Sequence, residues 1–210
     1  MQKPTEIWKP KSYNLGKRIV DLFGAILGLM VLFLLFPIIA ILIQWDSKGP
    51  TLFVQTRVGQ YGRRFKFIKF RTMSVGAFDK QWELSNLNET GGLTFKVRND
   101  PRITSIGRFL RRTSMDEIPQ FWNVLKGEMS LVGPRPPLLQ EVERYDDAQK
   151  IRMIVPQGMT GLWQIRGRSR LGFDAMVDLD VQYALNASFL LDLKIIVLTF
   201  PTLLWGRGAV

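Results

Sequence analysis

The 210-residue chain is 46% hydrophobic and 22% charged, and it carries a formal net charge of +11. This length and composition fit one folded domain, alone or with a membrane element, and the positive charge favours an anionic partner such as a phospholipid surface, a phosphorylated substrate or nucleic acid. The sequence contains no His and no Cys, so catalysis by imidazole or thiolate and metal sites built from these side chains are excluded, which leaves carboxylates, Lys, Arg, Tyr, hydroxyls or a cation bound by oxygen.

Residues 22–43 form an uninterrupted apolar run of 22 residues without a charge. A bilayer core about 30 Å thick needs roughly 20 helical residues, so the run predicts a membrane helix, with a long buried core helix as the alternative. Pro37 lies inside the run and predicts a kink or break. The basic flanking residues are Lys17 and Arg18 before the run, and Lys48, Arg57, Arg63, Arg64 and Lys66 after it. Because basic flanks favour the cytoplasmic side, this symmetry favours a re-entrant helix over a span.

Two strands and several helices are predicted after the membrane segment. Residues 51–58 and 64–71 predict a β-hairpin, and the polar stretch 78–92 predicts a short helix followed by a loop. Further helices are expected near residues 103–112, 115–126, 138–153 and 174–187, the second of them ending at Gly127. The apolar stretch 189–205 is interrupted by Asp192, Lys194 and Pro201, which favours a helix lying in the membrane interface.

These patterns predict a membrane-associated α+β fold that is mostly helical, with a small β-hairpin and amphipathic interfacial helices. The predicted divisions are a leader over residues 1–16, a re-entrant membrane helix over 17–48 broken at Pro37, a cytoplasmic catalytic domain over 49–187 and a C-terminal interfacial helix over 188–210.

Asp116 and Glu117 are two adjacent carboxylates at the expected start of a helix, next to the basic residues Arg108, Arg111 and Arg112. Ser114 and Glu117 match a capping box, which would need no catalytic role. The alternative is a phosphate site, because a helix start favours ionised carboxylates and binds phosphate. An ionised Asp is a competent nucleophile toward phosphorus, and its neighbour can hold Mg²⁺.

Arg135 lies between Pro134 and Pro136, and this restrained backbone favours a bidentate phosphate clamp over a solvated surface arginine. Lys69 and Arg71 fit either solvated strand residues or a further clamp. Asp178 and Asp180 are two residues apart on an expected helix and therefore face different sides. One of them is expected at the surface, while the other is a candidate to complete a metal or substrate site.

The sequence resembles the bacterial sugar transferases of the monotopic phosphoglycosyl transferase superfamily from about residue 17 to residue 204. The matching blocks are KRIVDLFGAI (17–26), KFRTM (69–73), RFLRRTSMDEIPQFWNVLKGEMSLVGPRP (108–136), PQGMTGLWQIRGR (156–168) and LDVQYALNASFLLDLKII (179–196). Larger relatives carry additional N-terminal spans, so the chain resembles either a minimal member or the catalytic part of a longer one.

The resemblance implies transfer of a sugar-1-phosphate from a UDP-sugar to polyprenyl (undecaprenyl) phosphate, with release of UMP. This reaction begins the assembly of capsule, O-antigen or exopolysaccharide. By the same resemblance, Asp116 is the nucleophile that forms an aspartyl-phosphosugar, and Asp116 and Glu117 hold Mg²⁺. The phosphate-binding residues implied or predicted are Arg135, Arg111, Arg112, Lys69 and Arg71, and Asp180 and Arg168 are candidates to support the substrate or metal. The segment 78–92 is a candidate for sugar selection.

The resemblance also implies a location at the bacterial inner membrane, with the catalytic domain on the cytoplasmic face and the helix re-entering its own leaflet at Pro37. The expected partners are the UDP-sugar, polyprenyl phosphate and an anionic phospholipid bilayer; no nucleic-acid partner is expected, and homo-oligomerisation is left open. Two rival functions remain. One is a non-catalytic membrane-anchored module that binds anionic lipid, and the other is a metal-dependent lipid-diphosphate hydrolase.

Overall fold

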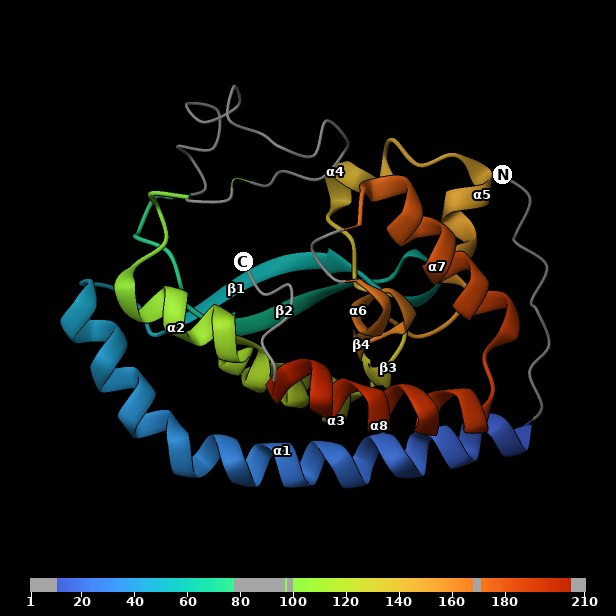
Figure 1. Ribbon diagram of the computed structural model, residues 1–210, viewed down its shortest axis with the longest axis horizontal. Helices are drawn as coiled ribbons and strands as arrows, with labels where there is room; N and C mark the ends of the chain where they lie inside the picture. The colour runs from blue at the N-terminus through green and yellow to red at the C-terminus, as the bar shows by residue number, and fades with distance from the viewer. Residues whose placement is uncertain (1–10, 78–96, 98–99, 168–170, 205–210) are drawn as a thin grey trace.

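The computed structural model describes residues 11–77, 97, 100–167 and 171–204. Most of the predicted leader, the segment 78–92, Arg168 and the last six residues of the predicted C-terminal helix lie outside these residues. The described part is mostly helical and contains two small two-stranded sheets (Figure 1). The mostly helical fold with a small hairpin is thereby confirmed.

The N-terminal apolar run forms α1 (Lys11–Asp46), a helix of 36 residues that lies along one side of the molecule (Figure 1). Its part from Tyr13 to Asp46 is long and apolar enough to cross a membrane. Only 17% of its most apolar stretch is buried against the rest of the protein. Phe23 and Phe33 are 67% and 80% exposed. An apolar surface of this extent, facing away from the protein, supports association with a membrane.

The sequence predicts a kink or break at Pro37, and the structure has a single bent helix without a break (Figure 1). α1 continues through Pro37, and Figure 1 shows it bending toward its C-terminal end. Pro37 cannot donate to the preceding turn and its ring crowds that turn, which accounts for a bend. Beyond it, Ile39 and Ile43 pack in one cluster with Phe70 and Leu110, and this packing keeps the rest of the helix on the protein. The re-entrant path of α1 stays a prediction.

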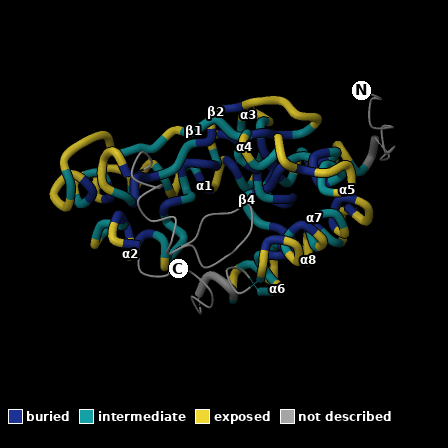
Figure 2. The backbone as a smooth tube through the Cα atoms, turned by 90° about the horizontal axis from the view of Figure 1, so that it is seen from above, coloured by how far each residue is buried: buried dark blue, intermediate teal, exposed yellow. Residues whose placement is uncertain are grey.

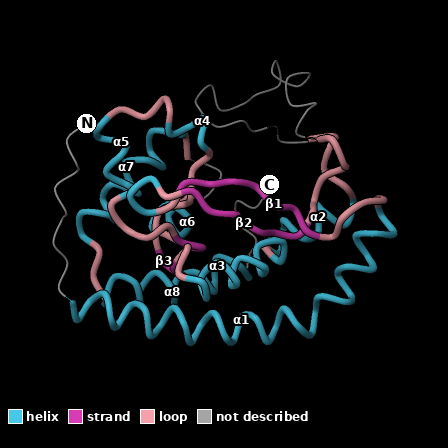
Figure 3. Tube along the Cα trace, turned by 180° about the vertical axis from the view of Figure 1, so that it is seen from behind, coloured by secondary structure: helices cyan, strands magenta, loops and turns pink. Residues whose placement is uncertain are grey.

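A β-hairpin lies above α3 (Phe121–Lys126), and α1 lies beneath α3 (Figures 1 and 3). In Figure 2 the helices alternate between buried and exposed residues, because each covers the protein with one face. Gly24 and Gly28 allow α1 to pack closely against Leu131 and Phe121. A Cβ at Gly24 would lie 2.6 Å from Leu131 Cδ1, and one at Gly28 would lie 2.2 Å from Phe121 Cδ2.

The predicted hairpin is confirmed as β1 (Leu52–Val58) and β2 (Arg64–Phe70), which pair antiparallel from Leu52 opposite Phe70 to Val58 opposite Arg64. The short 3₁₀ turn η1 (Gln60–Gly62) joins them. Phe65 and Phe67 are buried on the same face, as the alternation predicts, and pack with Val124 of α3. Lys69 therefore lies near the end of a strand whose Phe65 and Phe67 are packed in the core.

The predicted helix over 115–126 is divided. α2 (Ser105–Thr113) ends at Ser114, and the chain continues as the 3₁₀ helix η3 (Met115–Gln120) and then α3. Pro119 lies inside η3, and it lacks the N–H that a regular α-helix needs at that position. Gly127 ends α3 in a left-handed conformation with φ of 77°, as expected.

The capping box at Ser114 is also wrong. Ser114 is the C-cap of α2 with φ of 56°, and its side chain makes no capping hydrogen bond to η3. An N-cap residue that accepts from the following turn needs extended backbone, whereas Ser114 is left-handed. A capping box therefore does not explain the Ser114–Glu117 spacing in this structure.

The helix predicted over 138–153 is three short pieces: α4 (Leu139–Val142), α5 (Asp147–Lys150) and the 3₁₀ helix η4 (Ile151–Met153). The chain restarts because the Asp146 side chain caps α5, accepting from Gln149 N at 2.7 Å. Two further features were not predicted. β3 (Ser130–Val132) pairs in parallel with β4 (Gly158–Thr160), and α6 (Leu162–Arg166) follows β4.

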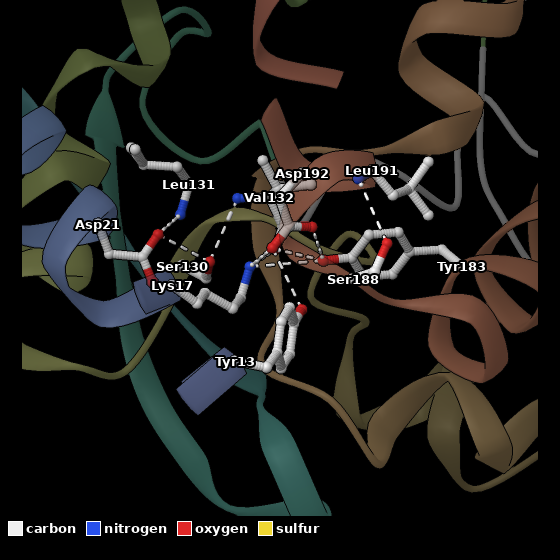
Figure 4. A network of polar contacts seen from close by, with 10 residues as sticks. All are labelled: Tyr13, Lys17, Asp21, Ser130, Leu131, Val132, Tyr183, Ser188, Leu191 and Asp192. Carbon is white, nitrogen blue, oxygen red and sulfur yellow. Dashed lines mark hydrogen bonds and ion pairs between the residues drawn. The ribbon is translucent and has the colours of Figure 1, made fainter. Parts of the chain in front are cut away.

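The last two predicted helices are present as α7 (Phe173–Asn186) and α8 (Phe189–Leu204). Asp192, which the sequence presents as an interruption of an apolar stretch, is buried in a polar network (Figure 4). Its carboxylate pairs with Lys17 Nζ at 2.9 Å and accepts from Tyr183 Oη at 2.6 Å. Lys17 also donates to Val132 O at 2.8 Å. The network thus joins α1, α7, α8 and β3.

Candidate active site

Asp116 lies in the first turn of η3, which packs against β2. It is buried, with 7% of its surface exposed. Three basic side chains act electrostatically on its carboxyl group: Lys69 from β2, Arg111 from the last turn of α2, and Arg135 from the loop after β3. The fold therefore brings together a carboxylate and three cations that lie far apart in the sequence.

Burial, followed by the negative charge of Glu117, raises the pKa of Asp116 to about 6, although Lys69, Arg111 and Arg135 oppose this rise. Burial therefore outweighs the preference for an ionised carboxylate that a helix start provides. At pH 7 a group with this pKa is ionised by roughly ten to one. Such a carboxylate is available as a nucleophile and is more basic than that of an exposed aspartate.

Lys69 is a partly buried cation rather than a fully solvated strand residue. Burial lowers the pKa of Lys69 to about 8; Asp116 opposes the change, while Arg111 and Arg135 add to it. Its ammonium lies 5.4 Å from the centroid of the Phe53 ring. Lys69 therefore remains mostly protonated at neutral pH and can face an anion.

Glu117 and Arg135 form the more open edge of the site. Arg135 Nη1 lies 3.6 Å from Glu117 Oε1, and their side chains are 43% and 29% exposed. A weak, solvent-accessible pair of this kind leaves both groups able to take other partners. Arg135 can turn to a phosphate and Glu117 to a cation.

Arg111 is better placed than Arg112 to act on the Asp116 carboxylate. Its Nε donates to Thr72 Oγ1 at 2.9 Å, which orients the guanidinium, and it acts on Asp116. Arg112 is the next residue on α2 and is exposed. The structure therefore supports Arg111, rather than Arg112, as the predicted cation beside the carboxylate.

A buried carboxylate with three cations around it and a second carboxylate beside it has the charges that can bind a phosphorylated substrate. Residues 12–206 match the family described as bacterial sugar transferase. The chain belongs to this family. It is 49% identical to the galactosyl transferase CpsE of Streptococcus agalactiae over 94% of this chain and 44% of that protein. It is 38% identical to the undecaprenyl-phosphate galactose phosphotransferase of Salmonella typhimurium, over 93% of this chain and 43% of the relative.

A shorter relative is covered more fully: the exopolysaccharide production protein ExoY of Rhizobium meliloti is 38% identical, over 93% of this chain and 88% of that protein. The chain thus spans less than half of the two longer transferases and most of ExoY. The family match over residues 12–206 covers the described elements except for the first residue of α1.

Arg71, which is predicted to bind phosphate, contacts the protein backbone in this structure. Its guanidinium donates to Ser47 O at 2.6 Å and to Lys48 O at 3.0 Å, and the residue is 6% exposed. These bonds fasten the turn after α1 to the end of β2. Arg71 is committed to backbone carbonyls, so the structure argues against a direct contact with substrate.

Asp178 and Asp180 face different sides of α7, as predicted, with Asp178 exposed and Asp180 buried. The Asp180 carboxylate forms an ion pair with Arg152 of η4, and its side chain has no exposed surface. Burial raises the pKa of Asp180 to about 6, although Arg152 opposes this. Asp180 is therefore paired with Arg152, a residue that sequence reasoning missed.

Mg²⁺ is expected to need the substrate as well as the protein. The described residues contain no group of three or more Asp or Glu side chains arranged to hold a metal ion. Mg²⁺ usually keeps several waters and binds one or two carboxylates together with substrate phosphates. Asp116 and the more exposed Glu117 fit that smaller protein contribution.

Proposed function

We propose that this protein transfers a sugar-1-phosphate from a UDP-sugar to a polyprenyl phosphate. The observation that carries the proposal is the buried Asp116 with Lys69, Arg111 and Arg135 acting on its carboxylate. Relatives named as undecaprenyl-phosphate galactose and glucose phosphotransferases support this reaction class. The identity of the sugar depends on contacts beyond these residues.

In the first step, a carboxylate oxygen of Asp116 attacks the phosphorus that bears the sugar. The bond from this phosphorus to the oxygen that bridges the diphosphate breaks, and UMP leaves with the electron pair. The product is a phosphosugar bonded to Asp116. Lys69, Arg111 and Arg135 reduce the negative charge of the diphosphate, which permits attack by an anion.

In the second step, a phosphate oxygen of the polyprenyl phosphate attacks the same phosphorus. The bond to Asp116 breaks, so Asp116 regains its carboxylate and the polyprenyl diphosphate sugar is released. Two steps with one nucleophile allow the enzyme to bind its two large substrates in turn. The low exposure of Asp116 also limits the access of water to the intermediate.

Asp116 and Glu117 are proposed to hold Mg²⁺ together with the donor phosphates. When bound, Mg²⁺ supplies positive charge that polarises the phosphoryl oxygens and stabilises the leaving phosphate. Glu117 would exchange its weak contact with Arg135 for this role, and Arg135 would then be free to bind phosphate.

We propose that α1 is embedded in a membrane from its cytoplasmic side. The acceptor would then enter the site from this membrane. An open apolar hollow of about 630 Å³ lies at the bend of α1, lined by residues that include Leu32, Phe36 and Pro37. Leu32 packs against the same apolar cluster as Met115, which precedes Asp116. We propose that a polyprenyl chain approaches the site along this hollow.

The proposal is tested by the acceptor dependence of UMP release. The protein, in detergent or nanodiscs with Mg²⁺, is given a UDP-sugar with and without polyprenyl phosphate. Multiple turnovers only with acceptor, and a polyprenyl diphosphate sugar as product, are expected. Steady hydrolysis of a polyprenyl diphosphate without any transfer would favour the hydrolase alternative, and lipid binding without either reaction would favour the non-catalytic module.

A further inference from the structure

The loop that carries Arg135 cannot hold itself in place with its own donors. Residues 134–137 read Pro-Arg-Pro-Pro, and proline has no backbone N–H. The loop presents mainly carbonyl oxygens, and buried carbonyl groups need donors from elsewhere in the chain. The identity of these donors decides how firmly Arg135 is positioned.

Each of the four carbonyls accepts a hydrogen bond from another element. The donors are Gly158 N to Pro134 O at 2.8 Å, Arg152 Nη2 to Arg135 O at 3.2 Å, Arg57 Nη1 to Pro136 O at 3.0 Å, and Val58 N to Pro137 O at 3.0 Å. Two of the donors are backbone groups of strands β4 and β1. The other two are arginine side chains, from β1 and η4.

Arg152 is the centre of a buried cluster. It is 6% exposed, its Nη1 donates to Tyr145 Oη at 2.9 Å, and its guanidinium lies 5.7 Å from the centroid of the Tyr145 ring. Its Nη2 donates both to the Asp180 carboxylate and to Arg135 O. Asp180 thus compensates a buried charge that also contacts Tyr145 and the backbone of Arg135.

Arg57 is the second side-chain donor to the loop. Its guanidinium lies 5.3 Å from the centroid of the Phe67 ring, so it is backed by the core of the hairpin, and its Nη1 reaches Pro136 O. Arg152 and Arg57 therefore donate to the carbonyls of two successive residues, Arg135 and Pro136. Charged donors make stronger hydrogen bonds than neutral ones.

We propose that Arg152 and Arg57 are positioning residues that fix the backbone of Arg135, so that its guanidinium meets the donor phosphate, and that Asp180 acts as the counter-ion of Arg152. This inference rests on the proposed function, because it needs Arg135 to bind phosphate. A displacement of about 1 Å in a binding group can cost about 100-fold in rate. Arg152→Met and Arg57→Met are therefore expected to lower kcat/KM for the UDP-sugar by about 10- to 100-fold.

The deciding measurement is a double-mutant cycle with Arg135→Met, scored as kcat/KM for UMP release. If Arg152 acts through Arg135, the double variant Arg135→Met with Arg152→Met should be no more than about twofold worse than Arg135→Met alone. The same is expected of Arg57→Met. A double variant that loses the full product of the two single effects would overturn the proposal, since Arg152 would then act elsewhere.

Arg71→Met is the matched control, because Arg71 is equally buried and also donates to backbone carbonyls. It can destabilise the protein, but its effect on kcat/KM should multiply with that of Arg135→Met. Where Arg152→Met does not fold, Arg57→Met decides the question by itself. If the wild type forms no polyprenyl diphosphate sugar from any donor, the proposed function fails; if it does and the cycles multiply, only the positioning role fails.

Discussion

Arg135 Nη1 lies 3.6 Å from Glu117 Oε1, so the Pro-Arg-Pro loop and the carboxylate pair meet at one edge of the site. Asp116, the neighbour of Glu117, is much more buried. The adjacent carboxylates therefore differ in environment, which suits them to the different tasks proposed here: the buried Asp116 to attack phosphorus and the more exposed Glu117 to bind a cation.

Replacing Asp116 with Asn is expected to abolish turnover while stabilising the fold. Because the pKa of Asp116 is raised from 3.8 to about 6, its ionised form is less stable in the folded protein than in the unfolded chain. At pH 7 without Mg²⁺ the Asn variant should gain up to about 3 kcal/mol. The gain should shrink between about pH 6 and pH 4, where the folded wild type takes up its proton. Thermal unfolding of both proteins at pH 7 and pH 4 checks this, and an Asn variant less stable than the wild type at pH 7 would contradict it.

The kcat/KM for the donor is expected to depend on pH in a bell shape. Its acidic limb should lie near the pKa of Asp116, about 6, because the protonated carboxyl cannot attack. Its alkaline limb should lie near the pKa of Lys69, about 8, because the neutral amine cannot offset phosphate charge. Lys69→Arg, which stays protonated, should remove the alkaline limb. An alkaline limb that survives in this variant would exclude Lys69 as its source.

Glu117→Gln is expected to raise the Mg²⁺ concentration needed for half-maximal rate by more than about tenfold, because one of the two carboxylates proposed to hold Mg²⁺ is lost. The same change should move the acidic limb to lower pH, since the charge of Glu117 raises the pKa of Asp116. A magnesium titration at several pH values measures both effects. Unchanged magnesium dependence would remove Glu117 from the metal site.

Lys17→Met is expected to destabilise the protein by about 3–5 kcal/mol, because it leaves the buried carboxylate of Asp192 without its cation. The matched control is Lys150→Met, which breaks the exposed pair with Asp147 and should cost less than about 1 kcal/mol. Unfolding in the same detergent compares them. Equal losses would mean that the network between α1 and α8 does not stabilise the fold.

Features set by local sequence could be predicted. The hairpin follows from alternating residues around a turn, α7 from its helical pattern, and the end of α3 from Gly127. Ser114 shows the limit of local rules. Its spacing to Glu117 fits a capping box, but the tight connection between α2 and η3 requires left-handed backbone there, and the cap is lost.

Features set by distant contacts could not be predicted. β3 and β4 are each three residues long, and the segment between them in the sequence contains Arg135 and Arg152. Strands this short show no alternating pattern that would predict them. Asp180 could be singled out by the family resemblance, but its partner Arg152 resembles any surface arginine in the sequence. Arg71 shows the reverse case, since a basic residue near a site can serve the fold alone.

Intact-protein mass spectrometry tests the role of Asp116 most directly. The protein is incubated with UDP-sugars and Mg²⁺ without a lipid acceptor. The expected result is a mass increase equal to one phosphosugar, absent in Asp116→Asn and discharged by polyprenyl phosphate. Acceptor-dependent UMP release that persists in Asp116→Asn, with no adduct on the wild type for any donor, would contradict the covalent mechanism and indicate direct transfer.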